Sequence, residues 1–416
     1  MVLKASSSRA GLMLLSVGCM VATATPHFAL AQQERRGTPA LDLPRPGFER
    51  HTSHVGPVEV RVEADVSALY DTNVYATSTK PQDDLIAIFR PRVEADYNSS
   101  TVSLHGEAYA EVREHLDIGR ESSAEFGAAL DGVLLPGRTH SLSTEIRYDR
   151  AIQSRADPEA RAPITARPRK IDIFSGEVAY TATTKRLRFL LAPAFQTYNF
   201  LDPAESDRDM HSYRVRGRVT WQPSAPMAFY LEAYGNYRDF RLRTDFSGVN
   251  RDATTYGALV GMSREVSGRL RGEIGVGVFH FDPSDATLNA YTGFAANGQL
   301  IWSPRARTAV TLSVFRGDVA TIQSGATGRT DTRLGLKIDQ EVRHNLLLTG
   351  GVGWLSSDYR GSATQKDTLT AQLGAEYLLD RKFSLFANAS YARRDASIPL
   401  DEYSRGRIEL GIRLRY

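Results

Sequence analysis

The sequence predicts an all-β fold, a transmembrane antiparallel up-and-down β-barrel of about 18 strands. Three observations predict it. Apolar and polar residues alternate in many segments, the connections between these segments alternate between short and long, and the chain has none of the runs of about 18 apolar residues that membrane-spanning helices need. The net charge of +3 gives no basic excess, so we expect no nucleic-acid partner.

Residues 1–31 have the features of a secretory signal peptide. Two basic residues precede an apolar stretch at 11–22, and an Ala-Leu-Ala cleavage sequence follows. We expect export and cleavage after Ala31, which removes the only cysteine and with it disulfides and thiol catalysis. The alternative is that 16–19 forms a lipoprotein box and leaves a lipidated Cys19 at the mature terminus.

Residues 32–56 are predicted to form a periplasmic linker. They contain Pro39, Pro44 and Pro46 and show little apolar patterning, which favours an extended segment. A docking role for a partner is the alternative interpretation. The remaining residues, 57–416, are predicted to form the barrel in the bacterial outer membrane.

A period of two residues runs from Val58 to the last residue. In 58–70 the valines, alanines and tyrosine occupy one face of a strand and the charged residues occupy the other. The same pattern recurs in 102–113, 213–221 and 408–416. Continuing the count gives about eighteen strands, with an uncertainty of about two.

Short and long connections alternate between successive predicted strands. Short connections are predicted near 98–101, 135–139, 183–186, 223–226, 265–268, 303–307, 341–345 and 379–382. Long polar connections are predicted near 71–84, 150–170, 201–212, 241–255, 282–292, 317–331 and 357–367. This alternation, with aromatic residues near both ends of the strands, is typical of outer-membrane barrels with short periplasmic turns. A soluble sandwich would instead turn its apolar faces into one shared core.

Apolar side chains that face lipid leave their neighbours to face the interior, because a charge on the lipid face costs about 2–4 kcal/mol at mid-membrane. About eighteen strands enclose an aqueous channel. The predicted pore-lining residues are Glu63, Asp65, Glu94, Asp96, Glu107, Glu111, Arg188, Arg214, Arg216 and Arg218.

The inward charges are unevenly distributed along the sequence. The first five strands carry eleven inward acids against five bases, and the next four carry five bases against two acids. This predicts an acidic wall facing a basic wall, which would favour polar or charged solutes. The alternative is that neighbouring charges neutralise each other.

Closure of the barrel would bring the last strand beside the first. We therefore expect Arg413 and Arg415 to lie close to Glu59 and Glu63.

Catalytic and metal sites are not expected. The sequence has no G-x-S-x-G or H-E-x-x-H motif, and we expect no cofactor. Four acids in 201–212 could gather calcium, but their spacing lacks the regular ligand pattern. A solvated acidic loop that faces the basic residues Arg155, Arg161, Arg167 and Arg169 is the favoured interpretation.

The last eight residues resemble the C-terminal β-signal of bacterial outer-membrane proteins. The match consists of Gly411, Leu414 and the terminal Tyr416. The resemblance implies that the barrel assembly machinery recognises this strand, and that outer-membrane lipid surrounds the folded chain.

The segments 70–76, Tyr-Asp-Thr-Asn-Val-Tyr-Ala, and 82–92 resemble the start of the putative β-barrel porin type 2 family. The resemblance implies a porin-like channel for polar solutes. Because members of that family are often associated with exopolysaccharide production and export, it also implies a polysaccharide or a polysaccharide export lipoprotein as a partner. A structural or surface-interaction barrel with a lumen plugged by loops is the alternative.

Overall fold

The computed structural model describes residues 45–416, except for 138, 161–162, 225 and 266–268. The predicted signal peptide, the lipoprotein-box alternative at Cys19 and most of the predicted linker lie outside the described residues. The described chain forms one antiparallel sheet of nineteen strands. The strands are β1 Ser53–Val55, β2 Val58–Asp71, β3 Asp84–Asn98, β4 Val102–His115, β5 Ser123–Leu134, β6 His140–Ile152, β7 Lys170–Thr183, β8 Leu187–Phe200, β9 Met210–Ser224, β10 Met227–Phe240, β11 Ala253–Glu265, β12 Leu270–Pro283, β13 Tyr291–Arg305, β14 Thr308–Val319, β15 Gly328–Arg343, β16 Leu346–Arg360, β17 Gln365–Leu378, β18 Phe383–Ala396 and β19 Tyr403–Arg415.

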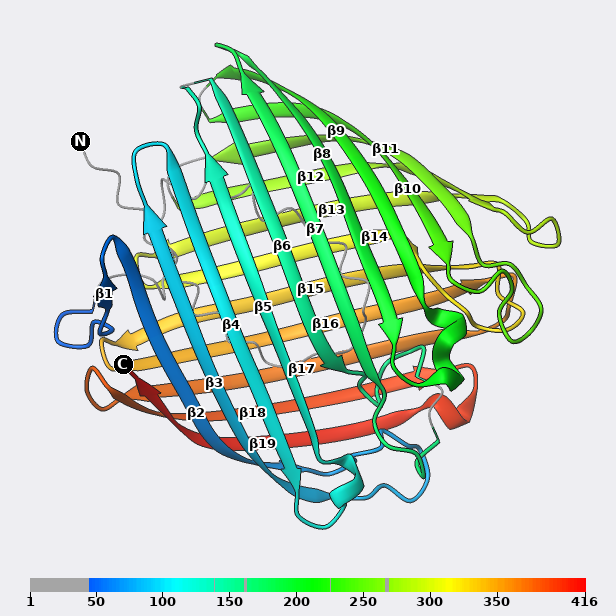
Figure 1. Ribbon diagram of the computed structural model, residues 1–416, viewed down its shortest axis with the longest axis horizontal. Coiled ribbons are helices and arrows are strands. Elements are labelled where there is room, and N and C mark those ends of the chain that lie inside the picture. The colour runs from blue at the N-terminus through cyan, green and yellow to red at the C-terminus, as the bar shows by residue number, and fades with distance from the viewer. Residues whose placement is uncertain (1–44, 138, 161–162, 225, 266–268) are drawn as a thin grey trace.

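Eighteen of the described strands, β2 to β19, form a closed barrel (Figure 1). Each pairs with the next strand in the chain, and β19 pairs antiparallel with β2, with Arg413 opposite Asp65. The short β1 lies outside this cycle and folds back on the start of β2. The all-β barrel of about 18 strands that the sequence predicts is therefore confirmed.

Short and long connections lie at opposite ends of the barrel, which we name the turn end and the loop end. All eight predicted short connections lie at the turn end, beside both termini of the described chain (Figure 1). The seven predicted long ones lie at the loop end together with two that the sequence pattern did not indicate, 116–122 and 397–402. Among the described residues, 3-10 helices lie in three of the loops, at Gly119–Glu121, Pro203–Arg208 and Pro399–Asp401.

Polar side chains fix the tight turns. Ser99 Oγ accepts a hydrogen bond from Val102 N at 3.0 Å, and Thr184 Oγ1 accepts one from Leu187 N at 3.0 Å. Asp380 Oδ1 similarly accepts a hydrogen bond from Phe383 N at 2.8 Å. These short side chains bind the backbone of the turn locally, so each strand reverses within a few residues.

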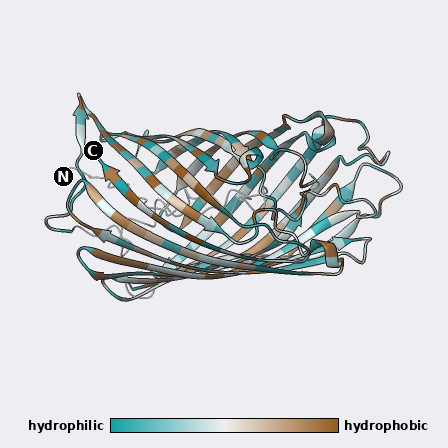
Figure 2. Cartoon of the chain, turned by 90° about the horizontal axis from the view of Figure 1, so that it is seen from below, coloured by the Kyte–Doolittle hydropathy of each residue, from teal (hydrophilic) through white to brown (hydrophobic). Residues whose placement is uncertain are grey.

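The barrel is apolar outside and polar inside, and hydrophobic and hydrophilic residues alternate along its strands (Figure 2). Leu373 and Leu410 on the outer face are 68% and 60% exposed, whereas Asp71 and Asp331 on the inner face are fully buried. Exposed aromatic residues occur near both ends of the outer face, for example Trp221 near the turn end of β9 and Tyr256 near the loop end of β11. In the described part of the chain no helix is long and apolar enough to cross a membrane.

Candidate functional site, the lumen and its crossing loops

All ten residues predicted to line a pore occupy inward positions, in alternation with exposed apolar residues. They lie on five strands: Glu63 and Asp65 on β2, Glu94 and Asp96 on β3, Glu107 and Glu111 on β4, Arg188 on β8, and Arg214, Arg216 and Arg218 on β9. Their side chains are partly or fully buried, because charged neighbours and loops cover them.

The acids of β3 contact a base on a neighbouring strand. Arg61 of β2 forms ion pairs with Glu94, at 3.1 Å, and with Asp96. His105 Nδ1 of β4 lies 2.8 Å from Asp96 Oδ1 on the side away from Arg61's strand. Charges of opposite sign on adjacent strands attract across the sheet, so this part of the wall is internally compensated.

A second group of charges surrounds Arg90 of β3. Arg90 forms ion pairs with Glu111 of β4 and with Glu409 of β19, and Arg113 also contacts Glu111. Arg90, on β3, therefore links β4 to β19 across β2. Glu409 was not among the predicted site residues, because the sequence count of inward charges stopped at the ninth strand.

The basic residues of β9 are also paired. Arg214 and Arg216 each reach a different oxygen of Glu177 on β7, at 3.4 Å. Arg218 contacts Glu232 of β10 and Glu273 of β12, both at 2.7 Å. Both carboxylates accept from the same guanidinium, so Arg218 joins two strands of the wall.

These contacts determine how the two walls are charged. Opposite charges meet within each wall, which is the second of the two alternatives that the sequence left open. Not every polar atom of the walls is paired, because Arg188 Nε has no hydrogen-bond partner among the described residues.

Ion pairs join β19 to β2 at the seam, in addition to the backbone pairing of the two strands. Arg413 donates two hydrogen bonds to Asp65, at 2.7 and 2.9 Å, and Arg415 lies 3.8 Å from Glu63. The predicted proximity of Arg415 to Glu63 is thus present, but the prediction for Glu59 was wrong. The strands pair with Arg413 opposite Asp65, which places Glu59 beyond the last residue of β19 that pairs with β2.

The residues of the predicted assembly signal lie along this seam. Gly411 faces inward below the ring of Phe386, and a Cβ at this position would lie 2.4 Å from that ring and 2.7 Å from Ser67 Cβ. Leu414 faces outward and is exposed. Tyr416 and Val62 exchange two backbone hydrogen bonds, at 2.8 and 2.9 Å.

The segment 70–76 forms a network of hydrogen bonds with β19 at the loop end of the same seam. The buried Asp71 accepts hydrogen bonds from Arg405 and Arg407 of β19, each at 2.9 Å. The amide of Asn73 donates to Ser404 O at 3.0 Å, and Tyr75 is buried. The Asp-Thr-Asn sequence therefore ties the first hairpin to the last strand.

A long loop extends across the barrel mouth. We name residues 153–169, between β6 and β7, the crossing loop. Its Pro158 O accepts hydrogen bonds from Lys366 Nζ of β17 at 2.8 Å and from Tyr359 Oη of β16 at 3.3 Å, and Ala156 O accepts one from Arg394 of β18. In the order of strands, β16 to β18 lie on the wall opposite β6 and β7. The crossing loop therefore spans the opening.

Glu159 is the ionic attachment point of the crossing loop. Its Oε1 accepts hydrogen bonds from Arg329 of β15 at 2.8 Å and from Thr321 Oγ1 at 2.9 Å. Burial of the carboxyl acts to raise its pKa, but Arg329, Arg208 and the hydrogen bonds from Thr321 and Ile322 outweigh burial, so the pKa of Glu159 lies below its ordinary value. The charged form is the one that this contact stabilises.

A second loop crosses in the other direction. We name residues 320–327, between β14 and β15, the opposing loop. Its Ile322 packs in an apolar cluster with side chains of β7, β8, β9 and β10, which are Ile171, Tyr198, Phe200, Met210 and Phe240. Arg251, from the loop after β10, donates to Ala326 O at 2.6 Å. The two loops meet at Glu159 and Thr321, so their contacts narrow the loop end of the lumen.

The acidic loop after β8 contains no candidate metal site. Asp202 and Glu205 contact Arg169, as the sequence predicted for one of the four basic residues, and Asp209 contacts Arg241 at 3.1 Å. Glu205 and Asp209 are 2% and 3% exposed, so the prediction of a solvated loop was wrong. Pairing with arginine lets these acids be buried. Across the described residues, no cluster of three or more His, Cys, Asp or Glu side chains could hold a metal ion.

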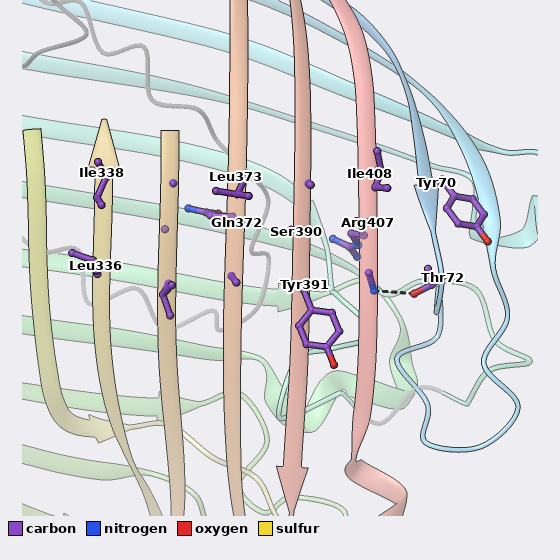
Figure 3. Close-up of a pocket in the computed structure, with 16 residues that line it drawn as sticks. Tyr70, Thr72, Leu336, Ile338, Gln372, Leu373, Ser390, Tyr391, Arg407 and Ile408 are labelled. Carbon is purple, nitrogen blue, oxygen red and sulfur yellow. Dashed lines mark hydrogen bonds between the residues drawn. The ribbon is translucent and has the colours of Figure 1, made fainter. Parts of the chain in front are cut away.

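The outer wall has an apolar hollow of about 630 Å³ (Figure 3). Small residues of β16 to β19 form its floor, and Leu336, Ile338, Leu373 and Ile408 border it. These bordering side chains are exposed on the face opposite the charged lumen. Because the hollow faces lipid, solutes in the lumen cannot reach it.

Comparison with known proteins places this barrel in a family. The family model described as "Putative beta-barrel porin 2" matches residues 45–416. The chain belongs to this family. It is accordingly a β-barrel protein of the bacterial outer membrane and a member of a non-enzymatic class. The family resemblance stated from the sequence is confirmed.

Several solved structures are similar to this porin-family chain at low sequence identity. OpdK from Pseudomonas aeruginosa is 10% identical, with 86% of this chain and 99% of that chain covered and a TM-score of 0.46. A BenF-like porin from Pseudomonas fluorescens Pf-5 is 11% identical, with 86% and 99% covered and a TM-score of 0.46. OccAB3 from Acinetobacter baumannii is 9% identical, with 87% and 100% covered and a TM-score of 0.46. No curated protein matches the sequence significantly.

Proposed function

We propose that the chain is a passive outer-membrane channel for small polar solutes, lined by the ten predicted residues and narrowed by the crossing loop. The observation that carries this proposal is the polar, charge-paired inner face. Buried ion pairs on the inner strands leave few apolar surfaces for a solute to contact, and an 18-strand barrel is wide enough to hold water. Polar and hydroxyl-rich solutes match such a wall.

The crossing loop supplies the size limit in this proposal. It is held at the far wall by Pro158 O, Ala156 O and the Glu159 carboxylate. Solutes would pass beside it, so the cut-off would fall well below the width of the barrel itself.

Swelling of liposomes in sugars of graded size tests this function. The purified full-length mature chain should admit small sugars and exclude large ones. The same contacts favour the alternative of a non-transporting structural or surface-interaction barrel, since two interlocked loops can plug a lumen. A barrel that admits no sugar at any size would support that alternative and contradict the channel.

Export of an exopolysaccharide is the narrower form of the proposal. Its support is the family resemblance of 70–76 and 82–92, and those first residues have a structural role at the seam. A polysaccharide chain would need the crossing loop to be displaced, for instance by the polymer itself or by an export lipoprotein. A disulfide between cysteines introduced at Pro158 and Lys366, whose contact holds the loop across the mouth, should then block polymer release from cells but leave small-sugar uptake intact.

The assembly role of Gly411, Leu414 and Tyr416 belongs to the same proposal. An alternating strand that ends in an exposed leucine and a terminal tyrosine can be bound by the barrel assembly machinery before it pairs with β2.

A further inference from the structure

Arg188 is an arginine of the inner wall that forms no ion pair within the described residues. It lies at an inward position one residue into β8, at the turn end of the barrel. Its buried Nε has no hydrogen-bond partner among the described residues, and its two terminal nitrogens are neither buried nor hydrogen-bonded within that part of the chain. A guanidinium carries five N–H donors and keeps its charge at neutral pH, so Arg188 presents unpaired donors to the lumen.

The neighbouring arginines on β9 differ from Arg188 because each contacts a carboxylate. The contacting set consists of Arg214, Arg216 and Arg218 with Glu177, Glu232 and Glu273. Arg218 is close enough to repel Arg188, and Glu273 attracts it, but the Glu273 carboxylate lies 2.7 Å from Arg218 Nη1. Four arginines therefore share three carboxylates in this set, which leaves one positive charge in excess.

The two positions directly opposite Arg188 carry hydroxyl groups and no carboxylate. They are Thr183 of β7 and Thr220 of β9. Directly opposite residues of antiparallel strands have Cβ atoms about 4.5–5.5 Å apart, so both threonines adjoin the arginine. A threonine hydroxyl can donate a hydrogen bond but carries no charge, so neither neighbour neutralises the guanidinium. We name Arg188, Thr183 and Thr220 the Arg188 site.

A carboxylate is the ligand that fits the Arg188 site. Its two oxygens accept parallel hydrogen bonds from a guanidinium, and such charged hydrogen bonds are about twice as strong as neutral ones. The single excess charge matches a monoanion, and the threonine hydroxyls can donate to lone pairs that the guanidinium leaves free. A sugar could accept hydrogen bonds here, but it would not offset the charge.

We propose that the Arg188 site binds the carboxylate group of small anionic solutes at the turn-end opening of the lumen. The excess of positive charge in this part of the wall raises the local concentration of such anions. Binding at the site stands independently of transport, whereas a preference of the channel for carboxylates rests on the proposed channel function.

The reactivity of an engineered cysteine tests the binding without any transport. A chain that begins at Gln32 has no cysteine of its own. Thr181→Cys places a thiol at the next inward position of β7, diagonal to Arg188 and about 7–8 Å from it. In detergent, a negatively charged thiosulfonate reagent should modify this thiol several-fold faster than a positively charged one, and Arg188→Ser should remove most of that preference.

A second reporter and a folding measurement serve as controls for this experiment. Ser103→Cys lies at an inward position on β4 at the same end, with the uncharged Asn98 and Val133 directly opposite. Its relative reactivity towards the two reagents should not respond to Arg188→Ser. The heat-modifiable mobility of Arg188→Ser should equal that of the wild type, because the arginine has no ion-pair partner among the described residues to lose. A reagent preference at position 181 that Arg188→Ser leaves unchanged overturns the site.

Competition by acetate identifies the carboxylate as the ligand. In the Thr181→Cys chain, sodium acetate should slow the anionic reagent more than sodium chloride at the same concentration, because chloride screens charge but cannot form paired hydrogen bonds. Arg188→Lys keeps the charge and loses the planar fork, so it should keep the reagent preference and lose the difference between the two salts. Equal slowing by both salts without the lysine substitution overturns the carboxylate site.

Planar bilayers test the consequence for transport. Under a gradient of sodium acetate, Arg188→Ser should lower the permeability ratio of acetate to sodium several-fold. Arg186→Ser is the matched control, since it removes the same charge from an exposed turn position two residues away and should leave the ratio unchanged. Anion preference in the reagent assay without conduction by any variant would retain the site and reject the channel. A permeability ratio that Arg188→Ser leaves unchanged would overturn the contribution of the site to selectivity.

Discussion

Arg413 of the last strand donates two hydrogen bonds, at 2.7 and 2.9 Å, to the carboxylate of Asp65 in the first strand, 348 residues away in the sequence. Both side chains are mostly buried, and Glu376 of β17 lies 3.4 Å from the same guanidinium. Two parallel hydrogen bonds fix the register of the pair as well as its distance. Closure of the barrel is therefore specified by side chains in addition to the backbone ladder.

Reversal of the seam charges should weaken the folded barrel. Arg413→Glu with Arg415→Glu would place acids against Asp65, Glu63 and Glu376, and loss of one partner of a buried pair costs about 3–5 kcal/mol. We expect a lower temperature for the heat-modifiable mobility shift on gels. Arg393→Glu, at an exposed ion pair, is the control and should leave that temperature unchanged. Unaltered melting of the double variant would contradict the assigned register.

Glu159 should make the permeability of the mouth depend on pH. Its pKa is lowered in the folded state, so its contribution to loop attachment is present at neutral pH and is lost as the pH falls below the ordinary glutamate range of about 4.3. We expect the conductance of the wild-type channel to rise on acidification from about pH 5 to pH 3.

Glu159→Gln separates this effect from the titration of other carboxylates. The variant should show raised conductance already at neutral pH and a smaller further rise in acid, because the charged contact with Arg329 is absent throughout. Glu114→Gln, at an exposed position near the loop end of β4, serves as the control. If Glu159→Gln and wild type gave the same pH profile, the crossing loop would not be held by this carboxylate.

The barrel could be predicted from the sequence because its strands pair with their neighbours and repeat every two residues. The outward direction of a residue such as Val66 follows from the alternation of apolar and charged residues within its own strand. The crossing loop has no such local signal. Its contacts join Glu159 to Arg329, 170 residues on, and Ala156 to Arg394, 238 residues on. A loop has no repeating pattern of apolar and polar residues, so the sequence does not indicate its contact partners. These partners can be identified only once the barrel is closed.

The prediction for Glu59 failed for a related reason. The charge pattern indicates that bases of β19 meet acids of β2, but several registers satisfy it equally well. The stagger between the first and last strands of a closed barrel is a property of the whole sheet. The distribution of opposite charges within each wall was similarly undetermined, because Arg218 reaches Glu273 three strands away.

Removal of the β9 arginines should change ion selectivity. Arg214, Arg216 and Arg218 together compensate Glu177, Glu232 and Glu273, so their replacement by serine leaves those three carboxylates without these partners. We expect the reversal potential in planar bilayers to shift towards cation selectivity. Lys185→Ser with Arg186→Ser in the β7–β8 turn is the control. An unchanged reversal potential in the triple variant would remove these residues from the conduction path.

Gly411 should be required for folding itself and not only for recognition by the assembly machinery. A methyl group at this position would lie 2.4 Å from the Phe386 ring and 2.7 Å from Ser67 Cβ, and both neighbours are buried. Ser67 Cβ is attached directly to the backbone of β2, so it cannot move aside without disturbing the seam. We expect Gly411→Ala to lower the yield of barrel refolded into detergent without any assembly factor.

A second substitution identifies the cause of that loss. Phe386→Leu in the Gly411→Ala background removes the ring contact and should recover part of the yield, while the remaining contact with Ser67 keeps recovery incomplete. Leu414→Ala is the comparison, because Leu414 faces outward and no inward packing depends on it. Normal refolding of Gly411→Ala, combined with failed assembly in cells, would instead assign Gly411 to recognition by the assembly machinery alone. The tight packing against Phe386 would then not contribute to closure of the barrel.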